Sequence, residues 1–429
     1  MRRSRSFFLL SLLLIVLCQV GMLLIVRPYY RELFSAAYWR SLVRVGEVMR
    51  LVHRNFVTGD AVAYPTLTEN ALRAIMADLD DYSQYMDKQS FAQFSMESDQ
   101  HYVGIGVEIQ WVDFRVTIGE IFTGSPAGEA GIQSGDQIIS VDGENTEASS
   151  VNEMSNVLRG QAGTDVTVTV YRPLEDQTYT FTFPRKPIDF PSIRKVEVSD
   201  DDWKLGYVRL VQFGRRSAAE FVEALNTLEE QGVRGLVFDL RNNPGGVLPI
   251  AVDIAGQFIE DGKMVVSTRG RDQDIVTSAY ADNGGNTRDY PIVVLINEYS
   301  ASASEIVAGA LQDYGRAIIV GQTSVGKGTV QSIYQLGDEV GLRMTTAKYY
   351  LPSGRTIHQS GVKPDVAVDI SEAERLKLFT QRNHLRYLDD VAFEKRFGFQ
   401  PIQDAQLEAA YSLLRGILAF RRAPAVVSR

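Results

Sequence analysis

Ser302 and Lys327 are the residues of this 429-residue chain whose types and surroundings best suit covalent catalysis. Ser302 lies where an apolar run, residues 291–296, gives way to small residues and then to a helical pattern. At such a junction a side chain projects above a sheet edge, and the helix N-terminus presents free N–H groups and a partial positive charge. Lys327 lies in an apolar, glycine-rich segment without a neighbouring acidic residue, which favours the uncharged amine that a general base needs.

Gln331 and Ala303 extend this pair into a set suited to acyl transfer. Residues i and i+4 share a face on a strand or a helix, so Gln331 could orient the Lys327 amine without adding a charge. The N–H of Ala303 could stabilise a developing oxyanion. The chain has four histidines, and none lies in a segment typical of a catalytic turn. The alternative for Ser302 is a helix cap, which is a common role of serine.

Gly245 and Gly246 follow a second apolar run, residues 236–240, and precede another helical pattern. Glycine lets a backbone N–H approach a substrate closely, so either residue could supply a second oxyanion donor. An ordinary turn between a strand and a helix would explain the same glycines. Pro244 occupies the position that the nucleophile takes in a trypsin-like turn, so the sequence disfavours that class of protease.

Residues 321–327 match the first seven positions of a phosphate-binding loop, but the eighth is Gly328 where serine or threonine is required. The residues that follow are typical of a strand, whereas that loop leads into a helix. Nucleotide binding is therefore disfavoured. A net charge of −9 likewise argues against a nucleic-acid partner, which would require a basic face. The proposed chemistry requires no metal and no cofactor.

The hydrophobic pattern divides the chain into segments. Residues 38–97 are predicted to be helical, and residues 98–175 form short strands separated by turns. Residues 176–370 alternate strands with helices, which indicates an α/β core with a mostly parallel sheet. Residues 371–429 are predicted to form a charged helical tail.

The N-terminal segment, residues 1–37, is predicted to anchor the protein in a membrane. A cationic start precedes an apolar run, residues 7–26, that is long enough to cross a bilayer. The run lacks the small residues of a cleavage site, so we favour an uncleaved anchor over a signal peptide. The expectation is a single-pass inner-membrane protein with its catalytic part on the periplasmic side.

Several motifs together resemble the carboxyl-terminal processing proteases, also called tail-specific proteases. The motifs lie at residues 239–246, 300–313, 316–317, 326–331 and 349–355. The resemblance covers roughly residues 40–370, and the combination is far more specific than any one motif.

The resemblance implies a role for each matching residue. Ser302 would be the nucleophile, Lys327 the general base and Gln331 the residue that orients it. Gly246 and Ala303 would form the oxyanion hole. Further positions match residues that support the site, namely Arg241, Gly245, Glu305, Asp313 and Ser324. The family often has threonine at the last of these, and serine keeps the hydroxyl.

Residues 102–107, 124–131 and 135–143 resemble a PDZ domain. In such a domain a glycine-rich loop binds a terminal carboxylate, and the following strand pairs with the peptide. The implied peptide-binding residues are Gly104, Ile105, Gly106 and Val107. The apolar side chains of Ile105 and Val107 predict protein substrates with apolar C-termini. The alternative is a β domain used only for packing.

Together these interpretations predict a membrane-anchored serine endopeptidase. The PDZ domain would bind the C-terminus of a protein, and a Ser-Lys dyad would cleave upstream through an acyl-enzyme. The main alternative is a catalytically silent PDZ-containing adaptor, against which the intact Ser302, Lys327 and Gln331 argue. A nucleotide-binding protein is the third hypothesis. The helical tail could bind an adaptor protein or form a homo-oligomer.

Overall fold

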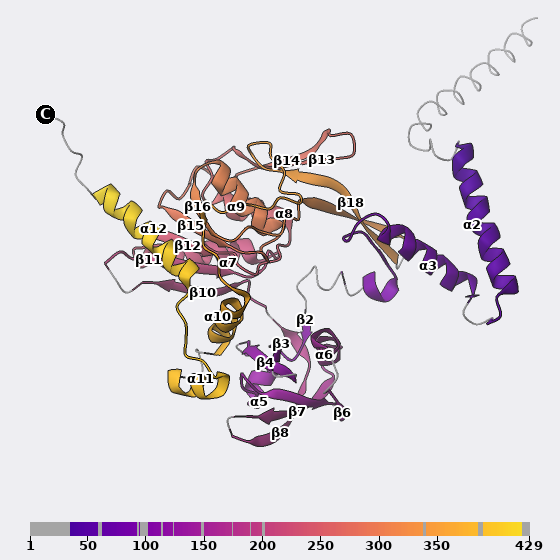
Figure 1. Ribbon diagram of the computed structural model, residues 1–429, viewed down its shortest axis with the longest axis horizontal. Helices are drawn as coiled ribbons and strands as arrows, with labels where there is room; N and C mark the ends of the chain where they lie inside the picture. The colour runs from indigo at the N-terminus through magenta and orange to yellow at the C-terminus, as the bar shows by residue number, and fades with distance from the viewer. Residues whose placement is uncertain are drawn as a thin grey trace, which may run out of the picture. The chain divides into compact units, whose positions relative to one another are not determined.

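The computed structural model describes residues 35–58, 62–91, 94, 102–112, 115–122, 124–146, 150–173, 175–188, 190–199, 202–337, 340–384 and 389–422 (Figure 1). Two compact units make up the chain, Met1–Tyr85 and Met86–Arg429.

The first unit contains the helices α2 (Ala36–Asn55) and α3 (Tyr64–Ala77). The hydroxyl of Ser35 caps α2 by accepting the N–H of Tyr38 at 3.4 Å. No residue of α2 is buried within the described structure. The short strand β1 (Gln84–Met86) follows these helices in the chain.

The predicted location in a membrane is not upheld. No helix within the described ranges is both long and apolar enough to cross a bilayer. α2 spans 20 residues but includes Arg40, Arg44 and Arg50, whose charges are costly to place in hydrocarbon. The predicted anchor itself, residues 7–26, lies outside the described residues. The prediction of a single-pass inner-membrane protein is therefore withdrawn.

A small β-rich region follows. Its strands are β2 (Tyr102–Gly104), β3 (Val107–Val112), β4 (Arg115–Ile121), β5 (Gln137–Val141), β6 (Glu144–Asn145), β7 (Asp165–Arg172), β8 (Gln177–Pro184) and β9 (Lys186–Ile188). Its helices are α5 (Pro126–Ala130) and α6 (Val151–Leu158). Strands β3, β4, β5, β7 and β8 form one antiparallel sheet, joined by β6, and β2 pairs with β9. Alternate residues Val166, Val168 and Val170 of β7 point into its core, as the period of a strand requires.

The central sheet of the protein has six strands, in the order β10, β11, β12, β15, β16 and β19. Their bounds are β10 (Ile193–Val198), β11 (Leu205–Leu210), β12 (Gly235–Asp239), β15 (Ile292–Ile296), β16 (Ala317–Gly321) and β19 (Val366–Ala367). β10 is antiparallel to β11, and the other neighbours are parallel. Every residue of β12 and β15 is buried, because helices cover both faces of a parallel sheet.

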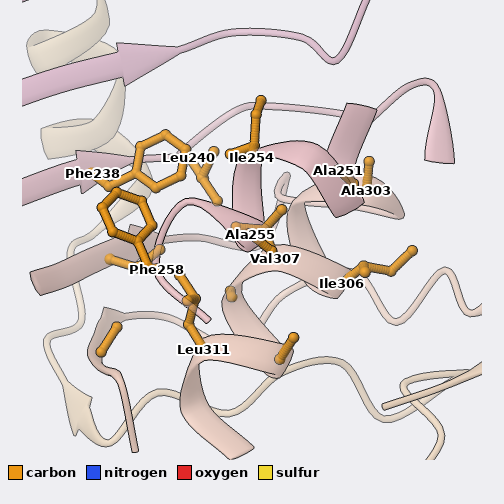
Figure 2. Packing of buried hydrophobic residues seen from close by; sticks show 14 of the residues in the cluster. Phe238, Leu240, Ala251, Ile254, Ala255, Phe258, Ala303, Ile306, Val307 and Leu311 are labelled. Carbon is orange, nitrogen blue, oxygen red and sulfur yellow. The ribbon is translucent and has the colours of Figure 1, made fainter. Parts of the chain in front are cut away.

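Three helices, α7 (Ser217–Glu230), α8 (Leu248–Gly256) and α9 (Ala303–Asp313), cover one face of this sheet. Figure 2 shows Phe238 of β12 and Phe258 packed together with Leu311 of α9. The opposite face is covered by α12 (Ala405–Arg422), which lies across the strands in Figure 1. This helix follows α10 (Glu372–His384) and α11 (Asp390–Phe397) in the C-terminal segment.

A second sheet corrects the prediction of a mostly parallel fold. Its strands β13 (Met264–Arg269), β14 (Ile275–Tyr280), β17 (Thr329–Leu336) and β18 (Val340–Tyr350) pair only in antiparallel fashion. Hairpin connections too short for a crossover helix join β13 to β14 and β17 to β18, and such connections permit only antiparallel pairing. The fold is therefore mixed α/β, with the parallel arrangement confined to the central sheet.

Candidate active site

Ser302 lies at the turn between β15 and α9 in a backbone conformation that is rare for a residue with a side chain. Its φ is 54° and its ψ is −112°, outside the regions that non-glycine residues favour. Such a conformation persists only where surrounding contacts hold it. Ala301 and Ala303 on either side are buried, whereas Ser302 is partly exposed. The fold thus holds the serine hydroxyl at the surface of a rigid turn.

Two of the contacts that hold this serine turn (residues 300–304) come from the turn after β12, which we name the glycine turn (residues 241–246). The N–H of Ala301 donates to the carbonyl of Asn243 at 3.0 Å. The hydroxyl of Ser304 donates to the same carbonyl at 2.9 Å. The two turns therefore form one hydrogen-bonded unit at the carboxyl ends of β12 and β15.

Glu305 is a fully buried carboxylate that joins the serine turn to the loop of Lys327. Its Oε2 accepts the N–H of Ser302 at 2.8 Å and the N–H of Lys327 at 2.9 Å. Its Oε1 accepts the hydroxyl of Ser324 at 2.5 Å and the N–H of Gly326 at 2.7 Å. Burial raises the pKa of Glu305, and these four hydrogen bonds oppose the rise. The backbones of the serine and the lysine thus meet at one oxygen atom.

Lys327 is partly buried on the loop between β16 and β17. Burial lowers the pKa of its amine, the positive charge of Arg343 lowers it further, and Glu305 opposes the change. A lowered pKa increases the fraction of neutral amine that can accept a proton. Position 328 of this loop requires glycine, because a Cβ there would lie 2.5 Å from the backbone nitrogen of His358.

Gln331 lies on β17, where its amide nitrogen donates to the hydroxyls of Thr329 at 2.8 Å and Thr345 at 3.4 Å. Because both amide hydrogens are directed to hydroxyls, the carbonyl oxygen is the group left to accept a bond. The bulge beside Gln331 lies in β18, since Val330 and Gln331 face Ala347 and Thr345, and Lys327 precedes β17. Because Lys327 lies outside the strand, the period of β17 does not extend to it, and the orienting role of Gln331 stays a prediction.

The glycine turn packs directly on the serine turn. Gly245 has a φ of 97° and Gly246 a φ of 150°, which favour glycine. A Cβ on Gly245 would lie 2.6 Å from the carbonyl oxygen of Ala301 and 2.8 Å from the nitrogen of Ala303. The N–H of Gly245 donates to the side-chain oxygen of Asn243 at 2.9 Å. Gly246 is therefore the better candidate for a second oxyanion donor beside Ala303.

Tyr349 contacts Ser302 although no argument from the sequence assigned it a role. Its side chain is 7% exposed, and the Ser302 hydroxyl lies close enough to its hydroxyl to influence its pKa. Its N–H donates to the carbonyl of Gly328 at 2.9 Å. Burial raises the pKa of Tyr349, and the interaction with Ser302 opposes the rise. The only sequence signal was its place in the motif at residues 349–355.

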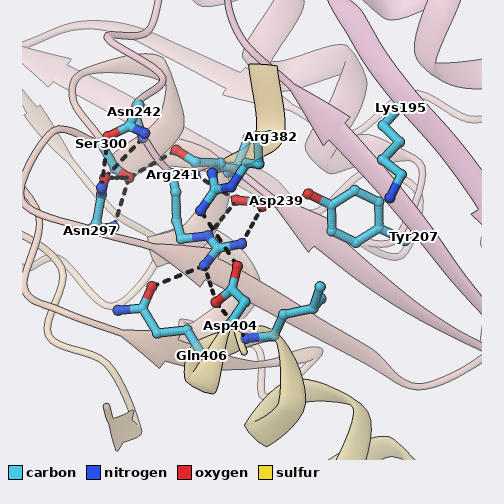
Figure 3. Close-up of polar contacts among 12 residues, drawn as sticks. Lys195, Tyr207, Asp239, Arg241, Asn242, Asn297, Ser300, Arg382, Asp404 and Gln406 are labelled. Carbon is cyan, nitrogen blue, oxygen red and sulfur yellow. Dashed lines mark hydrogen bonds and ion pairs between the residues drawn. The ribbon is translucent and has the colours of Figure 1, made fainter. Parts of the chain in front are cut away.

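Arg241 and Asp239 form a buried ion pair at the end of β12 (Figure 3). The arginine Nη2 lies 2.7 Å from Oδ2 of Asp239, and its Nε donates to Oδ1 at 3.0 Å. Burial would raise the pKa of Asp239, but the charge and hydrogen bonds of Arg241 hold it below its usual value. The remaining arginine nitrogen, Nη1, donates to Asp404 at 2.9 Å and to Gln406 at 3.1 Å. No motif in the sequence points to either of these tail residues.

Asp313 lies at the C-terminal end of α9. Its carboxylate pairs with Arg355 at 2.9 Å and accepts the N–H of Ser353 at 2.9 Å. Its contacts thus hold the turn after β18. Ser324, by contrast, lies within the site, because its hydroxyl donates to Glu305 and accepts the N–H of Val362 at 2.7 Å.

The four residues implied for peptide binding line one pocket of 220 Å³ in the β-rich region. Its walls are mostly apolar, and they are formed by Val103, Gly104, Ile105, Gly106, Val107, Ile109, Phe122, Ser155, Leu158, Arg159, Ile188 and Phe190. Among the residues that the structure describes, no group of three or more His, Cys, Asp or Glu side chains is placed to bind a metal ion.

Comparisons with known proteins support the resemblance. The profile of Peptidase family S41 matches residues 204–368, and that of the PDZ domain matches residues 117–172. The carboxy-terminal-processing protease of Bartonella bacilliformis is 35% identical over 396 residues, which cover 88% of this chain and 89% of that protein. The carboxyl-terminal-processing protease of Picosynechococcus sp. is 37% identical over 347 residues, 80% of each chain.

A solved structure, the photosystem II D1 C-terminal processing protease, is 30% identical with a TM-score of 0.48, covering 76% of this chain and 92% of that chain. The identity and coverage of the two relatives in sequence confirm the family that the motifs indicated. The chain therefore belongs to the carboxy-terminal processing proteases of peptidase family S41, which are serine-type peptidases, and it carries a PDZ domain.

Proposed function

We propose that this protein is a serine endopeptidase in which Ser302 is the nucleophile and Lys327 the general base. The observation that carries the proposal is the buried carboxylate of Glu305, whose Oε2 accepts the N–H of both residues. One oxygen atom thereby holds two segments of the chain together. The lowered pKa of Lys327 supports the same assignment.

In the acylation step, the neutral amine of Lys327 takes the proton of the Ser302 hydroxyl. The hydroxyl oxygen attacks the carbonyl carbon of the substrate, and the N–H groups of Gly246 and Ala303 stabilise the oxyanion. The lysine then gives its proton to the leaving amine, and an acyl-enzyme remains. In this scheme the carbonyl oxygen of Gln331 orients the amine.

Deacylation uses the same base. Lys327, neutral again after the amine has left, takes a proton from a water molecule that attacks the acyl carbonyl. The collapse of the second tetrahedral intermediate expels the Ser302 oxygen, which recovers a proton from the lysine. The acid product leaves and the free enzyme is restored.

The pocket in the β-rich region fits the apolar C-terminus of a protein substrate. The backbone of residues 104–107 lines it beside apolar side chains, which suits a peptide that pairs with a strand and buries its last side chain. The proposed substrate is therefore a protein with an apolar tail, cut upstream of the bound end.

The experiment uses the full chain and a protein substrate that ends in apolar residues. The wild type should cleave it and should react with a fluorophosphonate probe, whereas Ser302→Ala should do neither. Lys327→Ala should remain folded but lose activity by several orders of magnitude. Ser332→Ala, which removes a hydroxyl elsewhere on β17, serves as the control and should behave as the wild type.

Two outcomes would overturn the proposal. Full peptidase activity in Lys327→Ala would exclude the lysine as base. Binding of the tail by the wild type without cleavage or probe labelling would support the adaptor hypothesis instead.

A further inference from the structure

The segment that precedes α12 is bonded to the catalytic turns. Asp404 caps α12, because its Oδ1 accepts the N–H of Leu407 at 3.2 Å, and the same oxygen accepts Nη1 of Arg241 at 2.9 Å. Gln406 is fully buried, and its amide also donates to the carbonyl of Val368 at 2.9 Å. We name the group formed by Asp239, Arg241, Asp404 and Gln406 the tail clasp (Figure 3).

The clasp holds the guanidinium of Arg241 from two sides. Asp239 binds its Nε and Nη2, while the tail residues bind its Nη1. The side chain of Arg241 is 2% exposed, so water cannot replace a lost partner easily. Arg382 also lies 3.4 Å from Asp404. Without an acceptor oxygen at position 404, the buried Nη1 of Arg241 would keep only Gln406 as a partner, and Arg241 would be displaced.

A displaced Arg241 would move the glycine turn, because it is the first residue of that turn. Asn242 follows with a φ of 59° and exchanges two hydrogen bonds with Asn297, at 2.9 and 2.8 Å. The carbonyl of Asn243 then receives both bonds from the serine turn. The backbone path from Arg241 to Gly246 is therefore short. Hydrogen bonds to Asn297 and to the serine turn hold Asn242 and Asn243 along this path.

We infer that the tail clasp positions the glycine turn for catalysis, and that Asp404 and Gln406 are positioning residues of the active site. They act through Arg241 on the N–H of Gly246 and do not touch the substrate. Both lie beyond residues 204–368, the part of the chain that matches the peptidase profile. The inference rests on the proposed function, since it assumes the oxyanion hole described there.

Two substitutions at one position test the inference in the full chain. Asp404→Ser keeps a good helix cap but is too short to bind Arg241, so it breaks the clasp alone. Asp404→Asn keeps both the cap and an oxygen that can accept from Arg241. The measurements are kcat and KM with an apolar-tailed substrate, the pH profile, and the rate at which a fluorophosphonate modifies Ser302.

We expect Asp404→Ser to lower kcat by about 10- to 100-fold. This decrease is no larger than the decrease in kcat caused by removing one oxyanion donor. KM should change by less than about twofold, because the interaction is made in the transition state. Modification by the fluorophosphonate should slow in parallel, since its phosphoryl oxygen occupies the same hole. The pH midpoint should not move, because the surroundings of Lys327 are unchanged. Asp404→Asn should recover most of the activity.

Leu418→Ala is the matched control for stability. Leu418 lies on the same helix, 4% exposed against the central sheet, and does not belong to the clasp. It should lower the melting temperature while the folded enzyme keeps its kcat. The inference is overturned if Asp404→Ser keeps the wild-type kcat, if Leu418→Ala loses kcat equally, or if the pH midpoint shifts. In each of these cases, wild-type activity that still depends on Ser302 leaves the proposed function standing.

Discussion

The charge around Lys327 decides the pH at which the proposed base becomes active. Arg343 lowers the pKa of the amine and Glu305 raises it, while burial has the largest effect. The ammonium form cannot accept a proton, so activity should rise as the pH increases through the lysine pKa. The position of this rise therefore reports on the neighbours of the amine.

Replacing Arg343 with glutamine should move the acidic limb of the kcat/KM profile to higher pH. The loss of a nearby positive charge stabilises the ammonium form, so the amine keeps its proton to a higher pH. Lys348→Gln removes a charge of the same sign from an exposed position on the same strand and should leave the profile in place. An unchanged or acid-shifted limb in Arg343→Gln would contradict the assignment of Lys327 as base.

Tyr349→Phe should lower kcat by about 2- to 10-fold, which corresponds to about 0.5–1.5 kcal/mol for one hydrogen bond. The hydroxyl that it removes contacts Ser302, whereas the ring and its packing remain. Steady-state kinetics and thermal melting measure the two effects separately. Tyr350→Phe, at the next residue, is the control and should retain wild-type kinetics. An unaltered kcat in Tyr349→Phe would show that the hydroxyl does not restrain the nucleophile.

At the scale of the elements, the glycine turn and the serine turn can pack together only because Gly245 lacks a side chain. Gly245→Ala combines a φ of 97° with a Cβ 2.9 Å from that of Ser302. Gly262→Ala is the matched control, because its φ is 75° and nothing lies within 4 Å of the added Cβ.

The control should lose about 1–2 kcal/mol of unfolding free energy from its backbone conformation alone. Gly245→Ala should lose about 1–3 kcal/mol more from overpacking, and its peptidase activity should largely disappear. Urea unfolding and substrate cleavage provide the two measurements. Equal losses in both variants would mean that the turns do not pack as described.

The sequence could predict what is encoded locally. Ser302 and the glycines lie in strand-turn-helix segments, whose pattern is readable within a few residues, and the structure places them on adjoining turns. Contacts between distant segments were not predictable. Asp404 meets Arg241 across 163 residues, and nothing in the tail pattern points to that partner. Likewise, Lys327 precedes β17, so the period of the strand alone does not place Gln331 beside it.

At the scale of the whole molecule, we predict that a substitution can weaken binding of the peptide tail without changing the reactivity of Ser302. Val107 lines the 220 Å³ pocket, and Val107→Glu should remove its apolar contact and repel a terminal carboxylate. The loss of about 1.5 kcal/mol of burial corresponds to about a tenfold higher KM for an apolar-tailed protein. Val157→Glu changes an exposed valine of α6 outside the pocket lining and is the control.

The rate at which a fluorophosphonate labels Ser302 should be unchanged in both valine variants, since the probe has no tail to bind. A normal KM in Val107→Glu would argue for a domain that serves only packing. The domain boundaries remain predictions. The binding of an adaptor protein by the helical tail, or its role in forming a homo-oligomer, also remains a prediction.

The inferred role of the tail clasp also has a consequence for the order in which activity develops during synthesis. This helix covers one face of the central sheet, and the clasp residues directly before and within it follow Ser302 and Lys327 in the chain. On a ribosome, residues 404–406 therefore emerge after every other part of the site. A nascent chain that already displays its serine is expected to be about 10- to 100-fold less active until this last segment folds.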